Sequence, residues 1–129
     1  MAFHSVDGPN TQFLGKLLDP RVAESLLLPF LVEGESYITK AVFNSKNRPI
    51  DMYGHGTQGH LFLTNLRILF WPDGSAKPTL GLELTAISGY QTHWMPMKMR
   101  ALTVNTQDGS VMFASSKRAI EEIVAKLSS

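Results

Sequence analysis

Three basic residues, Lys40, Lys46 and Arg48, lie in and around a polar stretch that is typical of a loop. Cations spaced around one loop can hold a phosphate group through short, charge-assisted hydrogen bonds, and an arginine can donate two of them at once. Each cation near an anionic surface contributes only about 1 kcal/mol, so these three alone predict weak binding. A solvated loop whose charges protect the edge of a sheet is the alternative.

Further cations occur at Arg67 and at the start of the last apolar-periodic segment, where Ser116 precedes Lys117 and Arg118. The five donors of Arg67 suit either an anion or the carbonyl groups of nearby turns. Positive charge at a helix N-terminus opposes the helix dipole, and a bound anion at Ser116, Lys117 and Arg118 would resolve that conflict. The alternative is an ordinary exposed helix start.

An apolar segment around Pro96 contains Trp94, Met95, Met97 and Met99. Proline cannot donate to a strand ladder, so Pro96 indicates a turn or a sheet edge. Tryptophan and methionine on such a rim suit a protein partner, self-association or a membrane interface. Alternation along the strands could instead direct Trp94 and Met99 into the core.

Other chemistry has little support in the sequence. The chain has no cysteine, which excludes thiol nucleophiles and thiolate metal sites. A zinc site needs three or four converging ligands, and the glycines among His55, His60 and Asp51 predict a flexible turn instead. No phosphate-cradling glycine loop or nucleophile motif occurs. We therefore expect no catalytic residue, metal or cofactor. The dispersed basic residues and the net charge of +1 also argue against nucleic-acid binding.

The elements that must position these residues begin with two apolar runs between Gly59 and Phe70, joined by Thr64 and Asn65. Short leucine-rich and aromatic runs bounded by glycine and proline predict a buried β-hairpin. Further strand-sized runs flank it, separated by Pro, Gly or polar residues, and Gln107-Asp108-Gly109 predicts a tight turn. These additional predicted strands span residues 36–44, 80–84, 88–95, 100–106 and 110–114.

Helical periodicity appears twice. Residues 19–28 are predicted to form a helix, with Asp19 as the N-cap and Pro20 in the first turn. Residues 116–127 are predicted to form a second helix, because Ile120, Ile123, Val124 and Leu127 share one face. Burying that face would cover the apolar side of the sheet.

The hairpin pattern G-x-L-x-L-T-N-x-R-x-L-F resembles the central hairpin of GRAM-like and bacterial pleckstrin-homology-like domains. The likeness extends over residues 31–127 and includes Glu33-Gly34-Glu35 before the first strand. It implies a mainly β, α+β fold of the pleckstrin-homology type. Such a fold has about seven antiparallel strands in two orthogonal sheets or a partly open barrel, a short N-terminal helix and a C-terminal helix as cap. In lipid-binding members, cations placed like Lys40, Lys46 and Arg48 hold phosphoinositides.

The expected organisation is a mobile N-terminal arm, residues 1–12, followed by one domain, residues 13–129. The start of the chain lacks the basic and apolar regions of a signal peptide, so we expect a cytoplasmic location or a peripheral one on the inner face of a membrane. The leading hypothesis is a non-catalytic adaptor that contacts a protein partner or forms a homo-oligomer. The alternative is a peripheral membrane module that recognises anionic lipid headgroups.

Overall fold

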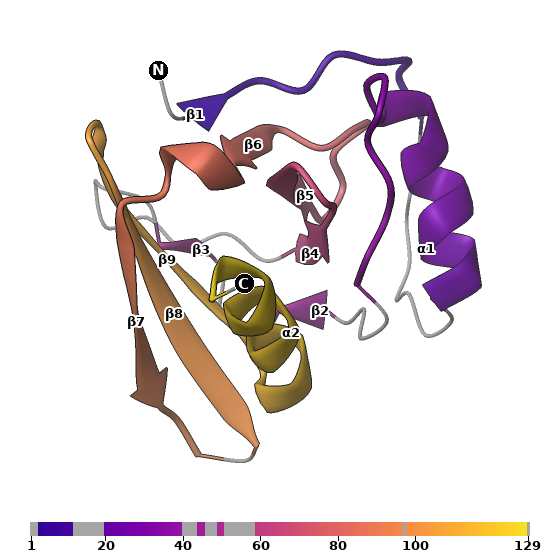
Figure 1. Ribbon diagram of the computed structural model, residues 1–129. Coiled ribbons are helices and arrows are strands. Elements are labelled where there is room, and N and C mark those ends of the chain that lie inside the picture. Colours follow the sequence, from indigo (N-terminus) through magenta and orange to yellow (C-terminus); the bar gives the residue numbers. More distant parts are fainter. Residues whose placement is uncertain are drawn as a thin grey trace.

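The computed structural model describes residues 3–11, 20–39, 44–45, 49–50, 59–96 and 98–128. Two antiparallel sheets face each other, with helix α2 against their open side and helix α1 outside the first sheet (Figure 1). The first sheet has the order β1-β6-β5-β4-β2 and the second the order β3-β9-β8-β7. The expected mainly β architecture with two helices is confirmed.

The bounds of the elements follow the predicted runs closely in the second half of the chain. The strands are β1 (Phe3–His4), β2 (Asn44–Ser45), β3 (Pro49–Ile50), β4 (Gly59–Leu63), β5 (Arg67–Pro72), β6 (Leu80–Glu83), β7 (Gly89–Trp94), β8 (Met99–Thr106) and β9 (Gly109–Ser116). The helices are α1 (Pro20–Leu27) and α2 (Lys117–Leu127), and two single 3-10 turns, η1 (Leu28–Phe30) and η2 (Leu84–Ala86), complete the described elements.

The predicted hairpin forms from β4 and β5, and it is buried on both faces. Leu61 and Phe70 point between the two sheets, where they meet residues of β8, β9 and α2. Phe62 and Trp71 point the other way, into a second cluster that includes α1. Successive side chains of a strand alternate between faces, so double burial explains why this stretch is an almost continuous apolar run.

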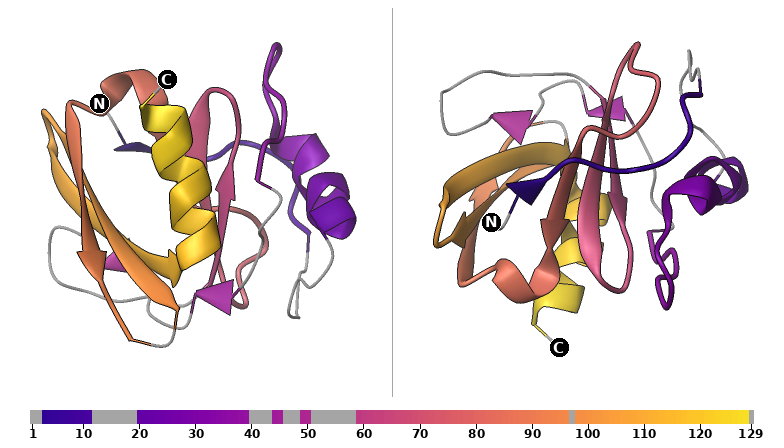
Figure 2. Two further views of the ribbon diagram at one scale, coloured as in Figure 1. Left: turned by 60° about the horizontal axis from the view of Figure 1, so that its bottom comes forward. Right: turned by 90° about the horizontal axis from the view of Figure 1, so that it is seen from above.

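Helix α1 supplies the second cluster with Ala23 and Leu27, and η1 adds Phe30, whose ring meets Trp71 edge-on with centroids 5.3 Å apart. Figure 2 shows α1 standing outside the first sheet in both further views. The core therefore has two layers, one on each face of the first sheet. The wider layer lies between the sheets.

Helix α2 begins one residue after the predicted start at residue 116. Ser116 is the N-cap, and its Oγ accepts a hydrogen bond of 3.1 Å from the backbone N–H of Ala119. Ile120 and Ile123 are buried in the layer between the sheets, against β8 and β9. The helix therefore closes the apolar face of the second sheet.

The first residues differ from the mobile arm that their composition predicts. Strand β1 pairs with β6, with Phe3 opposite Leu82, and Thr11 N–H donates a 2.7 Å hydrogen bond to Ala76 O. Val6 is only 1% exposed and belongs to the cluster beneath α1. Two apolar residues in a polar segment give no periodicity, so their burial depends on distant partners that local sequence does not reveal.

The predicted strand 36–44 is described only at its ends. Tyr37 forms an isolated bridge with Thr64, and Asn44 begins β2. Residues 40–43 lie outside the described residues. Across the described ranges, the structure contains no helix long and apolar enough to span a bilayer.

Candidate functional site

Strand β7 lies at the end of the second sheet. Within the described part of the chain, β8 is its only strand partner. Every side chain from Tyr90 to Trp94 is exposed, and Trp94 is 75% exposed. The structure thus places Trp94 on the surface and settles the choice that the sequence left open.

The backbone orientation of β7 follows from the hydrogen bonding of β8. Asn105 O accepts a 2.8 Å hydrogen bond from Ser88 N–H, so the backbone groups of Asn105 face β7. In an antiparallel ladder the direction of these groups alternates, and the residues of β8 that face β7 pair with Gly89, Gln91 and His93. The intervening residues, Tyr90, Thr92 and Trp94, therefore present their N–H and C=O groups away from β8. We call these groups the β7 edge.

The turn after β7 carries the predicted rim. Met95 and Met99 are half-buried, whereas Met97 lies outside the described residues. Arg100 Nη1 donates to Met99 O at 2.7 Å and to Met95 O at 3.4 Å, which ties the two sides of the turn together. Lys98 has a positive φ of 60° within this turn. The rim is therefore a tight, arginine-braced turn at the end of the β7 edge.

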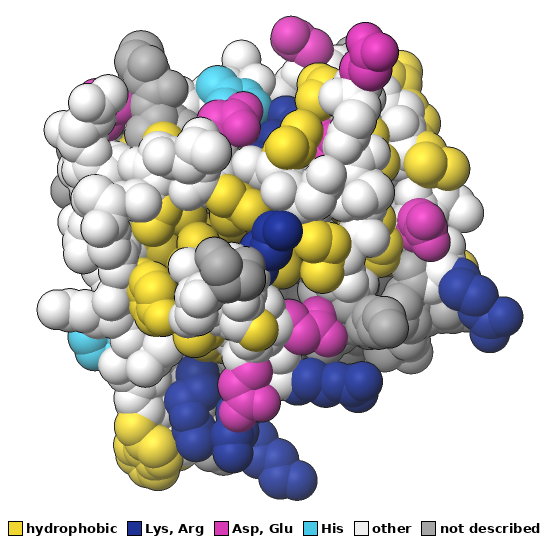
Figure 3. Space-filling model, viewed as in Figure 1, with side chains coloured by type: hydrophobic (Ala, Val, Ile, Leu, Met, Phe, Trp, Pro, Cys, Tyr) yellow, Lys and Arg dark blue, Asp and Glu magenta, His cyan; other side chains and the backbone are white. Residues whose placement is uncertain are grey.

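The same turn meets the start of α2. Lys98 O accepts a 2.8 Å hydrogen bond from Lys117 N–H. A shallow cavity of about 320 Å³ lies between these segments, lined by Lys98, Ser116, Lys117, Arg118 and Glu121. Figure 3 shows Lys and Arg side chains gathered at this end of the molecule. Two of the predicted sets, the rim and the helix start, are thus neighbours, and Lys98 joins them.

This basic cluster, Lys98, Lys117 and Arg118, is partly neutralised. Glu121 lies 3.8 Å from Lys117 Nζ, one helical turn along α2. Both side chains are more than half exposed, so solvent screens the pair and it holds the lysine only weakly. The cations stay accessible to an anion.

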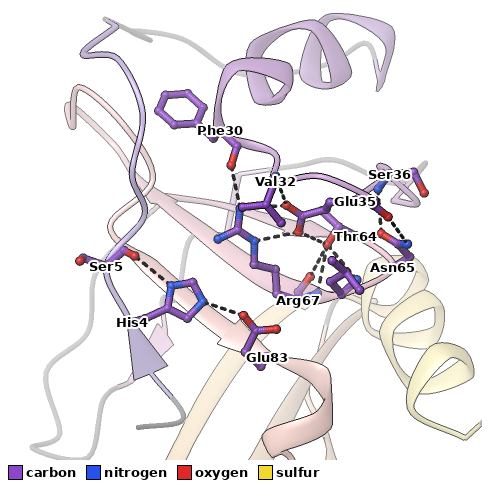
Figure 4. Close-up of polar contacts among 12 residues, drawn as sticks. His4, Ser5, Phe30, Val32, Glu35, Ser36, Thr64, Asn65, Arg67 and Glu83 are labelled. Carbon is purple, nitrogen blue, oxygen red and sulfur yellow. Dashed lines mark hydrogen bonds and ion pairs between the residues drawn. The ribbon is translucent and has the colours of Figure 1, made fainter.

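Arg67 occupies a different environment from these exposed cations (Figure 4). Its Nε donates to Glu35 Oε2 at 2.7 Å, and its Nη2 donates to Glu35 Oε1 at 2.8 Å and to Phe30 O at 2.7 Å. The side chains of Arg67 and Glu35 are 5% and 0% exposed. Because the guanidinium is engaged by a buried carboxylate, we assign Arg67 a structural role in place of the suggested anion contact.

Glu35 is the partner that the sequence did not indicate. Burial raises the pKa of its carboxyl, but hydrogen bonds from Arg67, Thr64 and the Val32 N–H outweigh burial and leave the pKa below the ordinary value. Asn65 completes the junction, since its Nδ2 donates to Gly34 O and its Oδ1 accepts from Ser36 N–H. The Thr-Asn-x-Arg part of the hairpin motif therefore fastens the segment before the first predicted strand.

The predicted phosphate-binding residues Lys40, Lys46 and Arg48 lie outside the described residues. The segments beside them are described: Ser45 ends β2 in the first sheet, and Pro49 begins β3 in the second. Ser45 and Pro49 thus belong to different sheets. Anion binding there remains a prediction.

His60 is buried on β4, whereas His55 and Asp51 lie outside the described residues. The ring stacks on Phe62, and Nδ1 is 3.6 Å from Asp73 Oδ1. Burial lowers the pKa of His60, and the nearby Asp73 charge offsets this only in part. Among the described residues, no group of three or more His, Cys, Asp or Glu side chains could hold a metal ion.

Comparison with known proteins identifies the architecture. A solved structure described as the Vps36 N-terminal PH domain superposes with a TM-score of 0.62 at 20% sequence identity, covering 98% of this chain and 93% of that one. The fold is that of a pleckstrin-homology domain. No protein-family model matches the sequence, and no curated protein matches it either. The PH-like fold predicted from the hairpin is confirmed, while the finer likeness to GRAM-like and bacterial members stays a prediction.

Sequence reasoning missed the length of the exposed site on β7. It singled out Trp94 but not Tyr90 or Thr92, which lie on the same face of the strand. A signal was present, because the run Tyr-Gln-Thr-His-Trp contains no aliphatic residue, unlike the runs that became β4 and β5. A strand without an aliphatic face has little to bury, which favours the exposed edge of a sheet.

Proposed function

We propose that this PH-like domain is a non-catalytic binding module that receives an extended segment of a protein at the β7 edge. PH-like folds generally serve as binding modules for proteins or lipids. The observation that carries the proposal is the exposure of β7 along its length, ending in Trp94. An extended segment can add to such an edge through main-chain hydrogen bonds, while its side chains contact those of the edge strand.

The sequence of β7 lacks the usual protection of an edge strand. Edge strands are commonly guarded by lysine, proline or a bulge that prevents further pairing. The run from Gly89 to Trp94 has no Lys and no Pro. Its pairing with β8 continues without a bulge from Gly89 opposite Asn105 to Trp94 opposite Arg100. These features support a strand that is open to a partner.

The proposal is tested by blocking the edge without disturbing the sheet. Thr92→Pro removes an N–H that points away from β8, a position where proline is tolerated. The probe is a phage-displayed library of random peptides of about ten residues, long enough to cover a strand. We expect peptides selected on the wild-type protein to lose binding to Thr92→Pro.

The matched control for the effect of proline is Ser110→Pro on β9. The folding of both proline variants is checked by circular dichroism. The exposed Ser110→Lys variant, on β9, which β8 separates from the β7 edge, should bind the selected peptides normally. Selected peptides that bind a folded Thr92→Pro variant unchanged, or a library that yields no binder, would refute the proposal.

A second candidate function rests on the basic cluster. Lys98, Lys117 and Arg118 surround one shallow cavity at the end of the molecule, and such cations attract anionic lipid headgroups. Co-sedimentation with liposomes of graded phosphatidylserine content, at two salt concentrations, tests this. We expect salt-sensitive binding that is lost in a Lys98→Glu, Arg118→Glu double variant and kept in Arg21→Glu on α1. If the double variant and Arg21→Glu pelleted with the liposomes to the same extent, the basic cluster would not be the binding site.

A further inference from the structure

We propose that the β7 edge pairs with the β7 edge of a second copy of this chain, antiparallel, about a two-fold axis at Thr92. The second sheets of the two copies would then form one continuous sheet. This inference rests on the proposed function of the β7 edge and names the partner. It commits to a homodimer, and an unrelated protein segment on the same edge is an alternative outcome of the test.

The geometry of β7 limits the ways in which two copies can pair. A two-fold axis perpendicular to a sheet keeps each face on its own side, so only residues of the same face can lie opposite each other. Tyr90 and Thr92 lie opposite Val104 and Leu102, whose side chains enter the core, so Tyr90, Thr92 and Trp94 share the inner face. These three residues also carry the outward backbone groups. The residues that can hydrogen-bond to a second copy are therefore the same residues whose side chains lie on the inner face.

With the axis at Thr92, the strand is complementary to itself. Thr92 meets Thr92 of the partner subunit, and Tyr90 meets Trp94 of the partner subunit at both ends. Aromatic pairs and threonine pairs are among the cross-strand contacts that stabilise antiparallel strands. On the outer face, Gln91 meets His93 of the partner subunit. The strand contains no Asp, Glu, Lys or Arg, so no like charges are placed opposite each other.

Other registers lose this match. Placing Gln91 on the axis sets Tyr90 opposite Thr92 and leaves Trp94 beyond the end of the partner strand. Placing His93 on the axis sets Thr92 opposite Trp94 and sets Tyr90 opposite Pro96, in the turn beyond the partner's β7. Only the Thr92 register pairs both aromatic residues within β7.

Two contacts within a single copy prepare the edge for this pairing. The Tyr90 hydroxyl shares a 2.6 Å hydrogen bond with the Ser128 hydroxyl at the end of α2, which holds the tyrosine in one position. Arg100 braces the turn that follows Trp94. A pre-organised edge loses less conformational freedom on pairing. An interface built mainly from one six-residue strand is small, so the dimer is weak and depends on protein concentration.

The absence of cysteine allows a direct test, because any introduced thiol is the only one in the chain. In the proposed register, Thr92→Cys meets its own copy and should form a covalent dimer under mild oxidation. Gln91→Cys and His93→Cys should each crosslink poorly alone and form a mixed dimer when combined. Ser110→Cys, exposed on β9, gives the rate of random collision.

Sedimentation velocity over a range of protein concentrations completes the test. We expect the wild-type mass to rise with concentration, and Thr92→Pro to remain a monomer with unchanged circular dichroism. Thr92→Cys dimers forming no faster than those of Ser110→Cys, or a wild-type protein monomeric throughout, would overturn the homodimer. The peptide selection separates the two proposals. If the protein is strictly monomeric but binds peptides that Thr92→Pro does not bind, the proposed function stands and only the homodimer is refuted.

Discussion

At the scale of single residues, the junction between Arg67 and Glu35 shows why a motif can identify a fold without identifying a ligand. The arginine is conspicuous in the sequence because it follows a turn inside an apolar hairpin. Its partner precedes it by more than thirty residues, in a segment of ordinary composition. Local pattern can therefore place Arg67 on a strand, whereas the choice between a ligand and a carboxylate depends on a long-range contact.

This ion pair should be sensitive to the loss of either partner. Arg67→Met leaves the carboxylate of Glu35 buried without its main donor, and breaking a buried pair in this way typically costs about 3–5 kcal/mol. We expect a loss of that order in the free energy of unfolding, measured by urea denaturation. Arg118→Met, an exposed substitution, should change it by no more than about 0.5 kcal/mol. Similar losses in the two variants would contradict the structural role of Arg67.

The lowered pKa of Glu35 predicts an acid-sensitive fold. In the unfolded chain this carboxyl takes up a proton near its ordinary value of 4.5, before it does so in the folded protein. Its contribution to stability is therefore present above that pH and is lost as pH falls through the lower folded pKa. Denaturation curves from pH 6 downward should show this loss. Glu35→Gln should be less stable at neutral pH and flatter against pH below 4.5.

His60 adds a dependence in the same direction at higher pH. Burial lowers its pKa from 6.5, so below that pH the unfolded chain binds a proton that the folded protein excludes. Stability should therefore decrease as pH falls from about 7 towards the folded pKa of this histidine. His60→Phe, which can keep the stacking on Phe62, should remove that part of the slope. An unchanged slope between pH 7 and 5 would argue against a neutral, buried His60.

At the scale of elements, neighbouring strands of one sheet show what the sequence predicts well and what it does not. The bounds of β8, β9 and α2 follow from alternation, the Asp-Gly turn and helical periodicity, all of which are local signals. The existence of β7 was equally predictable. Its exposure was not, because tyrosine, threonine and tryptophan favour strands in general and do not reveal whether a further strand covers them.

A matched pair of substitutions separates exposed from buried positions across this ladder. Leu102 on β8 is fully buried and lies opposite the exposed Thr92 on β7. Leu102→Ala should lower the free energy of unfolding by about 2–5 kcal/mol, because it leaves a cavity between the sheets. Trp94→Ser should change it by about 0.5 kcal/mol or less when measured at low protein concentration. A large loss of unfolding free energy in Trp94→Ser would mean that the Trp94 side chain packs against other residues of the same chain.

At the scale of the whole molecule, the two proposed surfaces lie close together but use different groups. The β7 edge offers backbone hydrogen bonds and two aromatic side chains, whereas the basic cluster offers charge. In an antiparallel pair, the two basic clusters would lie towards opposite ends of the joined strands. Two weak headgroup sites on one particle bind a surface more tightly than either alone, provided that both can reach it. Self-pairing would therefore strengthen any membrane binding without a new contact.

The order of synthesis gives the N-terminal strand a further consequence. Phe3 leaves the ribosome well before its strand partner Leu82, which lies far along the sequence. Val6 and Leu27 also precede Trp71, which belongs to the same cluster. Until Trp71 and Leu82 emerge, the nascent chain carries an unpaired strand and an apolar helix face, the kind of surface that chaperones bind.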